Sequence, residues 1–493
     1  MFPDLDPFFR DNSARLQAAL RDIGKPGGMM DARDQLGDGG EAAAIALLAD
    51  PALNVNNPNN PAHTAGTTFM GQFLDHDVTF DLTSRLAVVA EPTDSPNERT
   101  PAFDLDSVYG GGPLRDPDLY VRPRDRRERP TKLRIEHGGL FEDLPRNRDG
   151  AIIADPRNDE NMMIAGLQAA FIMFHNKCVD LLEDDRRLSS EEVYERAHKL
   201  TTWHYQWIIV HEILPLFIGQ AMVNDILRDG RRFYRPEKAF IPIEFQGAAY
   251  RFGHTLVRPS YRANLAGDND NSAFFAMIFV PDGAEGNPTD PIDLRGGARA
   301  RRRFIGWQTF FDFGPTFTDG PGNTNPAIRP NKLIDTTIST PLFHLPLGTI
   351  AGGAPGDIVA LPQRNLLRHI TWSVPSGQRI AREMRAPVLT GDNDQVLRQL
   401  REYRLNLDDS TPLWFYVLRE GRVLGSGGQH LGPVGGRIVG EVFLGLLELD
   451  RDSYLNADRR WRPTLPQRNG RSGDFRMIDF LTFAGVAPDQ RGQ

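Results

Sequence analysis

The chain has 493 residues, 40% of them hydrophobic and 25% charged, which are the proportions of a soluble globular protein. Its formal net charge of -8 at pH 7 argues against nucleic acid as the main partner, because phosphate binding depends on clustered lysine and arginine side chains. A single cysteine, Cys178, excludes an internal disulfide, so packing and any bound ion or cofactor must stabilise the fold.

The N-terminal region predicts an arm rather than a separate domain. Residues 1–60 combine a short amphipathic segment near Ser13–Ile23 with glycine- and asparagine-rich turns. The first residues, Met1–Asp6, lack the basic and apolar blocks of a secretory signal peptide, and no run of about 18 apolar residues predicts a transmembrane segment. We therefore expect a protein that is either cytoplasmic or exported by a non-classical route.

The stretch Thr67–Phe80 predicts a helix that carries polar side chains into an apolar setting. Gln72 and His76 lie one turn apart and share a face, and phenylalanines occupy neighbouring positions. Asp75 and Asp77 flank the imidazole in the sequence. By itself the segment leaves three interpretations of His76 open, namely a general base, a metal ligand and a satisfied core residue.

The stretch Arg99–Gly110 is dense in oxygen donors at alternate positions. The donors are the Thr100 hydroxyl, the Ala102 carbonyl and the carboxylates of Asp104 and Asp106. Calcium is bound by about six to eight oxygens of these types, and an extended loop presents alternate residues to one side. The alternative is an aspartate-rich turn that holds no ion.

Arg157 stands just before a long apolar helix, which we expect to run from Met162 to Asp180. The acidic and amide residues around it are typical of a capping turn, with Asp155 or Asn158 as the helix cap. A capping turn explains these neighbours but leaves the role of the guanidinium group open.

His254 lies in an apolar helical sequence that ends at Pro259, where a buried neutral imidazole is either a core residue or a ligand. By themselves, Asn365 and Arg368 are consistent with a cap residue and a surface residue at the start of a helix. Residues 260–350 are rich in glycine, proline and polar side chains, so we expect long loops and short helices there.

Five of these stretches occur in the order found in the animal-type haem peroxidases, the peroxidase–cyclooxygenase superfamily. Gly71-Gln-Phe-Leu-Asp-His-Asp77 resembles the distal-histidine helix of that family, and Arg251-Phe-Gly-His-Thr-Leu256 resembles its proximal-ligand motif almost letter for letter. The resemblance implies a mostly α-helical fold with a single large haem peroxidase domain over residues 61–493, on which residues 1–60 pack as an arm. It overrides the two or three domains that the chain length alone suggests.

The resemblance also implies the distal catalytic residues. His76 corresponds to the base that moves a proton between the oxygens of hydrogen peroxide, and Arg157 to the cation that stabilises negative charge as the O–O bond breaks. Gln72 is expected to order a distal water or a halide.

On the proximal side, the resemblance implies haem b with His254 as the ligand of the iron. Asn365 would accept a hydrogen bond from this histidine, and Arg368 would pair with a haem propionate. Asp75 and Glu160 match positions that form ester bonds with haem methyl groups in mammalian members of the family.

The acidic loop corresponds to a calcium site in the family. Thr100, Ala102, Asp104 and Asp106 are its expected ligands, and Asp77, next to the distal histidine, is expected to complete the shell. Asp106 stands where myeloperoxidase-like members have serine, which changes the charge of the ligand.

The implied activity is that of a haem peroxidase, which reduces hydrogen peroxide and, through an oxidised haem, oxidises a halide or a small organic donor. A fatty-acid dioxygenase is the first alternative, but Arg251 stands where that branch has its radical tyrosine, and Tyr250 is one residue further away. The second alternative is a non-catalytic, calcium-stabilised binding protein. The presence of the complete set His76, Arg157, His254 and Asn365 argues against it.

Overall fold

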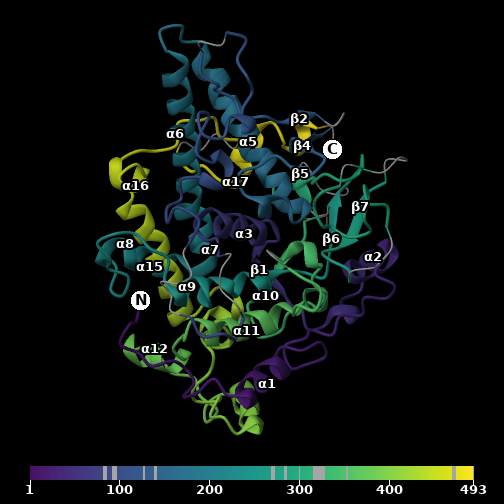
Figure 1. The fold of residues 1–493 in the computed structure, drawn as a ribbon, viewed down its shortest axis with the longest axis vertical. Coiled ribbons are helices and arrows are strands. Elements are labelled where there is room, and N and C mark those ends of the chain that lie inside the picture. Colours follow the sequence, from purple (N-terminus) through teal and green to yellow (C-terminus); the bar gives the residue numbers. More distant parts are fainter. Residues whose placement is uncertain are drawn as a thin grey trace.

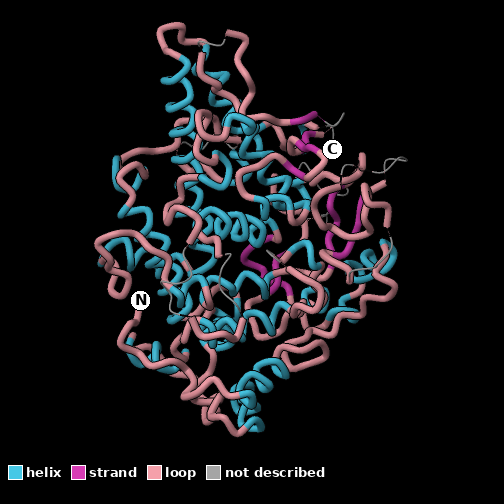
Figure 2. Tube along the Cα trace, viewed as in Figure 1, coloured by secondary structure: helices cyan, strands magenta, loops and turns pink. Residues whose placement is uncertain are grey.

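The structure is a computed structural model that describes residues 1–81, 86–90, 97–125, 128–137, 141–267, 272–281, 286–298, 300–314, 328–350, 353–468 and 473–491. Its described part is mostly α-helical, as Figures 1 and 2 show, and its short strands pair in twos. The mostly α-helical fold class predicted from the sequence is confirmed.

Helices make up most of the regular structure. The α-helices are α1 (Ala14–Ile23), α2 (Glu41–Ala49), α3 (Gly66–Val78), α4 (Asp106–Tyr109), α5 (Met162–Glu183), α6 (Ser190–Ile208), α7 (Leu214–Ile218), α8 (Gln220–Asp229), α9 (Ile243–Gln246), α10 (Gly253–Leu256), α11 (Leu361–Thr371), α12 (Gly377–Glu383), α13 (Gln395–Gln399), α14 (Leu413–Leu424), α15 (Pro433–Leu449), α16 (Tyr454–Ala457) and α17 (Met477–Ala484).

The named strands form antiparallel pairs. They are β1 (Asn59–Thr64) with β8 (Pro330–Lys332), β2 (Glu136–His137) with β3 (Glu142–Asp143), β4 (Arg146–Asn147) with β5 (Gly150–Ala151), and β6 (Ser260–Asn264) with β7 (Phe274–Met277).

Helix α3 lies near the centre of the molecule and contacts α5 and α10 (Figure 1). Phe73 of α3 stacks on Phe171 of α5, with the ring centroids 4.4 Å apart. Gly71 permits a close approach to α7, because a Cβ at this position would stand 2.8 Å from the ring of Phe217. Tight packing of α3 against α5 and α7 holds the polar residues of α3 in fixed positions.

Helix α5 begins where the sequence predicts and extends one turn further, to Glu183. Its cap is Asn161, whose side chain accepts a hydrogen bond from the backbone of Ile164, whereas Asp155 caps the preceding one-turn 3-10 helix. By length and composition α5 could cross a membrane, but 72% of its most apolar window is buried inside the protein, as in a core helix.

The chain is helical from Ser190 to Ile218 in three joined segments, which are α6, a π-helical turn η5 (Ile209–Ile213) and α7. A capping box starts α6, because the Ser189 side chain accepts from the backbone of Glu192 and the Glu192 carboxylate accepts from the backbone of Ser189. The hydrogen-bond spacing of this helical stretch therefore changes at η5.

The prediction of loops and short helices for residues 260–350 is incomplete, because β6 and β7 form a hairpin there. Ser260 pairs with Met277, and Arg262 pairs with Phe275. Nearly every residue of β6 is buried. The sequence of β6, Ser-Tyr-Arg-Ala-Asn, does alternate polar and apolar residues, whereas β7, Phe-Phe-Ala-Met, is a short apolar run that periodicity alone does not distinguish from a buried helix.

The N-terminal residues join the same hydrophobic core as the rest of the chain. α1 buries Leu16, Leu20 and Ile23 and contacts α11. The amine of Met1 pairs with the carboxylate of Glu244 at 2.9 Å. These contacts support the arm proposed for residues 1–60.

Candidate active site

A cavity of about 290 Å³ is bordered by α3, α10, α11 and two 3-10 helices, η4 (Pro156–Asp159) and η6 (Ala249–Phe252). Its volume is near the lower end of the usual range for ligand pockets, about 300–1,000 Å³. The polar lining residues include Gln72, Asp75, His76, Arg157, Glu160, Arg251, His254 and Arg368, and the apolar ones include Phe69, Phe217, Phe252, Leu256, Leu342 and Leu345. Distal and proximal residues predicted from separate motifs therefore meet at one cavity.

His76 is buried on α3, and its Nδ1 lies 2.9 Å from Oδ1 of Asn158. Burial, aided by the charge of Arg157, lowers the pKa of the imidazole from 6.5 to about 4. The ring is therefore neutral at physiological pH. With Nδ1 occupied by the asparagine, a neutral ring keeps one nitrogen, Nε2, for other chemistry.

Arg157 is fixed by three acceptors. Its Nε and Nη2 donate to the two carboxylate oxygens of Asp155 at 3.0 and 2.7 Å, and Nη2 also donates to the carbonyl of His76 at 3.0 Å. The guanidinium group lies over the ring of Phe80, 4.2 Å from its centroid. Arg99 donates to Asp155 as well, so one carboxylate lies between two cations.

Asp155 keeps its negative charge in this cluster. Burial acts to raise its pKa, but hydrogen bonds and charge from Arg157, together with Arg99, outweigh burial and lower the pKa below 3.8. Arg99 also pairs with Asp106 at 3.5 Å, and Arg157 is the member of this cluster that lines the cavity. Arg157 can therefore act on negative charge that develops there.

Gln72 and Glu160 contact each other, with the Gln72 amide donating to the carboxylate. Asn161 donates to Oε1 of Gln72 at 3.2 Å, so both ends of the glutamine side chain have protein partners. Burial raises the pKa of Glu160 to about 8, which favours its protonated form. Asp75 accepts a hydrogen bond from the hydroxyl of Thr79 at 3.0 Å.

His254 lies in the short helix α10, which ends at Leu256 rather than continuing to Pro259. Its Nδ1 is 2.7 Å from the side-chain nitrogen of Asn365, and Oδ1 of that amide accepts from Arg251 at 3.1 Å. Burial, with the charge of Arg251, lowers the pKa of the imidazole to about 3, so the ring is neutral.

The direction of the hydrogen bond between His254 and Asn365 differs from the prediction, in which Asn365 accepts and His254 donates. Here the amide nitrogen faces the ring, because Arg251 occupies the amide oxygen. Nδ1 then accepts, and Nε2 carries the proton. Ligation of a metal through Nε2 needs the reverse arrangement, which a half-turn of the Asn365 amide with a shift of Arg251 would provide.

Arg368 projects from α11 and pairs with Asp81 at 3.2 Å, and its guanidinium group lies over Trp372. Burial, with the charges of Arg251 and other groups, lowers its pKa to about 9. In this structure its charge is therefore met by a carboxylate of the protein.

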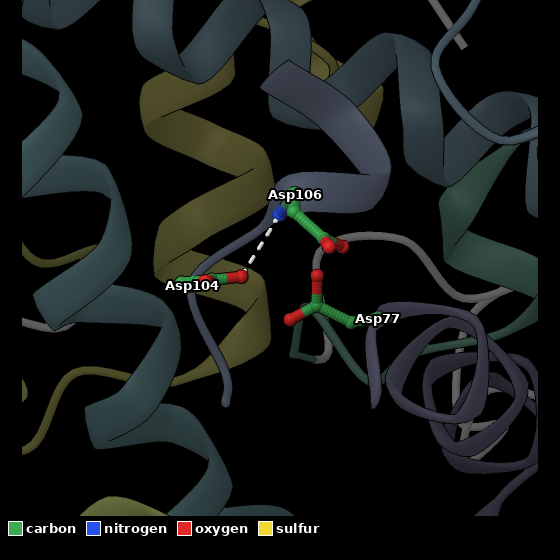
Figure 3. Close-up of side chains that lie close together, drawn as sticks. All are labelled: Asp77, Asp104 and Asp106. Atoms are coloured by element: carbon green, nitrogen blue, oxygen red, sulfur yellow. Dashed lines mark hydrogen bonds between the residues drawn. The ribbon is translucent and has the colours of Figure 1, made fainter. Parts of the chain in front are cut away.

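Asp77, Asp104 and Asp106 converge on one point beside α3, as Figure 3 shows, and a carboxylate oxygen from each lies within 4.8 Å of the others. Burial and the charges of the other two raise the pKa of Asp77 well above 3.8, and burial with the charge of Asp106 raises that of Asp104 to about 7. Burial and mutual repulsion thus disfavour the charged forms of these carboxyl groups, and a bound cation would stabilise those charged forms.

Further contacts fix this acidic loop on α3. Asp77 accepts from the hydroxyls of Ser107 and Tyr205 at 3.1 and 2.9 Å. Thr100 donates its backbone N–H to Asp106 at 3.0 Å, and its carbonyl accepts from the backbone of Ala102. Four of the expected ligands thus belong to the stretch from Thr100 to Asp106, and the fifth, Asp77, comes from α3.

The model of the animal haem peroxidase family matches residues 81–282. Over this region the chain is similar to the animal haem peroxidases. The matched region contains Arg157 and His254, whereas His76 and Asn365 lie outside it. A match to the animal haem peroxidase family implies a haem cofactor.

Individual relatives agree with this assignment. Eosinophil peroxidase of Mus musculus is 28% identical over 211 residues, which are 36% of this chain and 28% of that protein. Peroxidase A of Dictyostelium discoideum matches 98% of this chain and 94% of its own with a TM-score of 0.62 at 14% identity. A fatty acid alpha-dioxygenase of Oryza sativa matches 86% of this chain and 75% of its own, with a TM-score of 0.59 at 14% identity.

These structural similarities show a shared fold. The chain spans less than a third of the length of the curated relatives it matches.

The residues that line the cavity fit haem. His254 offers a neutral imidazole at the cavity wall, and apolar side chains such as Phe252 and Leu256 suit a porphyrin face. Arg251 and Arg368 provide buried positive charge close by, of the kind that binds carboxylates.

Two residues at the site were assigned no such role from the sequence. Asn158 was considered only as a helix cap, yet it contacts the ring of His76 across 82 positions of the chain. Arg251 was considered only as a replacement for tyrosine, yet it occupies the oxygen of Asn365. One sequence feature points to a different role for Asn158: it is an amide in a turn where other residues, Asp155 and Asn161, cap the helices.

Proposed function

We propose that this protein is a peroxidase that holds haem b through His254 and uses hydrogen peroxide to oxidise a halide or a small organic donor. The observation that carries the proposal is that His76, Arg157 and His254 line one cavity. Cleavage of peroxide at haem requires three groups, namely an acid–base group, a fixed cation and a ligand of the iron.

Haem, when bound, supplies the iron at which peroxide is cleaved and at which the oxidising equivalents are held. His76 takes a proton from peroxide at Nε2 and returns it to the departing oxygen, because the neutral ring has a free electron pair on that atom. Arg157, fixed by Asp155, stabilises the negative charge that develops as the O–O bond breaks.

A direct test is the absorption spectrum and turnover of the purified holoprotein. We expect a Soret band and steady oxidation of a chromogenic phenol by hydrogen peroxide. A preparation reconstituted with haem that shows no Soret band would contradict the proposal and favour a non-catalytic binding protein.

A fatty-acid dioxygenase is the second candidate, and the fold shared with the rice alpha-dioxygenase supports it. Tyr250, the tyrosine nearest to the expected radical position, donates its hydroxyl to the carbonyl of Gly71 at 2.8 Å and stacks on Phe245. Oxygen uptake with linoleate in the absence of peroxide would favour the dioxygenase over the peroxidase.

The pH dependence of the reaction with peroxide tests the role of His76. Because the pKa of this ring is lowered to about 4, the neutral base persists down to that pH and is lost only below it. We expect the second-order rate constant, measured by stopped-flow absorption, to be level from neutral pH to about 4 and then to fall about tenfold per pH unit. An inflection near 6.5, the ordinary value for histidine, would contradict this assignment.

We propose that the acidic loop binds Ca²⁺ through Asp77, Asp104, Asp106, Thr100 and Ala102. A cation that binds only the folded state raises the melting temperature, so calcium should raise it by a few degrees relative to protein treated with a chelator. Asp104→Asn should require more calcium for the same rise. Equal melting temperatures with calcium and with chelator, in both proteins, would exclude the site.

We also propose that Asp75 and Glu160 form ester bonds with haem methyl groups during turnover with peroxide. Both carboxyl groups line the cavity. After turnover, acidified ketone should extract less haem from the parent protein than from a variant with Asp75→Asn and Glu160→Gln. Complete extraction from both would show that no such bond forms.

A further inference from the structure

Asn158 lies in η4 and is completely buried between three other parts of the chain. Its side chain contacts His76 of α3, Ser107 of α4 and Gln168 of α5. A buried amide with partners in three helices has few ways to rotate. Its orientation therefore decides which hydrogen bonds its neighbours can make.

The partners of the amide nitrogen fix this orientation. Nδ2 of Asn158 donates to Oε1 of Gln168 at 2.9 Å and to the backbone carbonyl of Ser107 at 3.4 Å. A backbone carbonyl can only accept, so the atom that faces it must be the amide nitrogen. The amide oxygen is then the atom that faces Nδ1 of His76, at 2.9 Å.

The tautomer of His76 follows from this arrangement. An amide oxygen can only accept, so Nδ1 of the ring must carry the proton. A neutral imidazole has one N–H, and the proton on Nδ1 leaves Nε2 with a free electron pair. Nε2 is the atom that the proposed reaction needs as a base.

These hydrogen bonds belong to a closed cycle that also includes the acidic loop. Ser107, whose carbonyl accepts from Asn158, donates its hydroxyl to Asp77 at 3.1 Å, and Asp77 is the residue after His76 on α3. Each residue of this hydrogen-bonded cycle is bonded to the next. The cycle therefore fixes both the position of Asn158 and the orientation of the imidazole.

We infer that Asn158 is a positioning residue for the peroxidase reaction, which keeps the proton of His76 on Nδ1 so that Nε2 is free to accept one. This inference rests on the proposed function and deepens it by assigning a role that the family resemblance did not supply. Loss of the amide oxygen would allow the proton to move to Nε2, and the ring would no longer be poised as a base.

The experiment compares two ligands of the haem protein by stopped-flow absorption at about pH 8, above the ordinary pKa of histidine. Hydrogen cyanide must lose a proton as it binds to ferric haem, so its association reports on the base. Carbon monoxide carries no proton, so its association with ferrous haem reports on access alone.

Asn158→Leu removes the acceptor at similar volume, and Gln168→Leu removes a bond of the same buried network without touching His76. We expect Asn158→Leu to slow cyanide association about tenfold or more, as for loss of a general base, and to leave carbon monoxide association within about twofold. Gln168→Leu should leave both rates within about threefold, because the Ser107 carbonyl still orients the asparagine.

Asn158→Asp provides a rescue. Its carboxylate still accepts from Nδ1 but can no longer donate to Ser107 or Gln168, so we expect cyanide association to remain within about threefold of the parent rate. Asn158→Ala, which adds no bulk, replaces the leucine variant if that protein does not fold, and it should slow cyanide about fivefold or more.

Three results would overturn the inference. One is parent-like cyanide association in a folded, haem-loaded Asn158→Leu or Asn158→Ala protein. Another is equal slowing by Asn158→Leu and Gln168→Leu, which would indicate general loss of packing. The third is an Asn158→Asp protein as slow as the leucine variant. Absence of haem binding by the parent chain would instead refute the proposed function itself.

Discussion

His254→Ala is expected to abolish stable haem binding and, with it, oxidation of donors by peroxide. The ring of His254 is neutral because burial lowers its pKa to about 3, and it lies at the wall of the cavity. Alanine offers no electron pair to iron, and the apolar walls alone would hold a porphyrin weakly. The Soret absorbance per mole of protein and the turnover of a phenol measure both effects on one sample.

His430→Ala is a suitable control for His254→Ala. His430 is a partly buried histidine that contacts Ser426 and the carbonyl of Leu431 and is absent from the cavity lining. Its replacement should leave haem content and turnover unchanged. Parent-like haem content and turnover in the His254→Ala protein would remove the ligand assignment, and added imidazole should partly restore haem binding if the assignment is right.

His76→Ala is expected to leave haem bound but to slow the reaction with peroxide by about 10²–10⁴-fold, the usual contribution of a general acid–base group. That loss corresponds to about 3–5 kcal/mol of activation free energy. Stopped-flow absorption of the haem on mixing with peroxide measures this step separately from donor oxidation.

Gln72→Leu serves as the comparison for His76→Ala, because Gln72 lines the same cavity one turn away on α3 but has no acid–base group. It should slow the reaction far less. Similar losses in the two variants would mean that disturbance of α3, rather than loss of a base, explains the effect. A His76→Ala protein that reacts at the parent rate would exclude His76 as the base.

The long helices of the fold could be predicted from the sequence because their evidence is local. α5 shows helical apolar spacing over Met162–Asp180 and ends within one turn of the prediction, and α3 lies within two residues of the predicted stretch Thr67–Phe80 at each end. The hairpin of β6 and β7 is harder to predict, because β7 is a four-residue apolar run that periodicity does not distinguish from a buried helix, and the alternation of polar and apolar residues in β6 covers only five positions.

The candidate site could be predicted as a set of residues but not as a network. The motifs identify His76, Arg157 and His254, and all three line the cavity. The amide of Asn158 and the carboxylate of Asp155 gain their roles only from neighbours distant in the chain, His76 and Arg99. No local pattern encodes such contacts, because they depend on how η4 packs against α3 and the acidic loop.

His76 and Asp77 are consecutive residues of one helix, and neighbouring side chains on a helix are rotated by about 100°. One therefore faces the cavity while the other faces the acidic loop, and neither can shift without the other. Free-energy coupling between two binding events is reciprocal. If a cation at the loop raises the affinity of the cavity for a ligand by some factor, that ligand raises the affinity of the loop for the cation by the same factor. The calcium affinity of the loop then reports on which ligand the cavity holds.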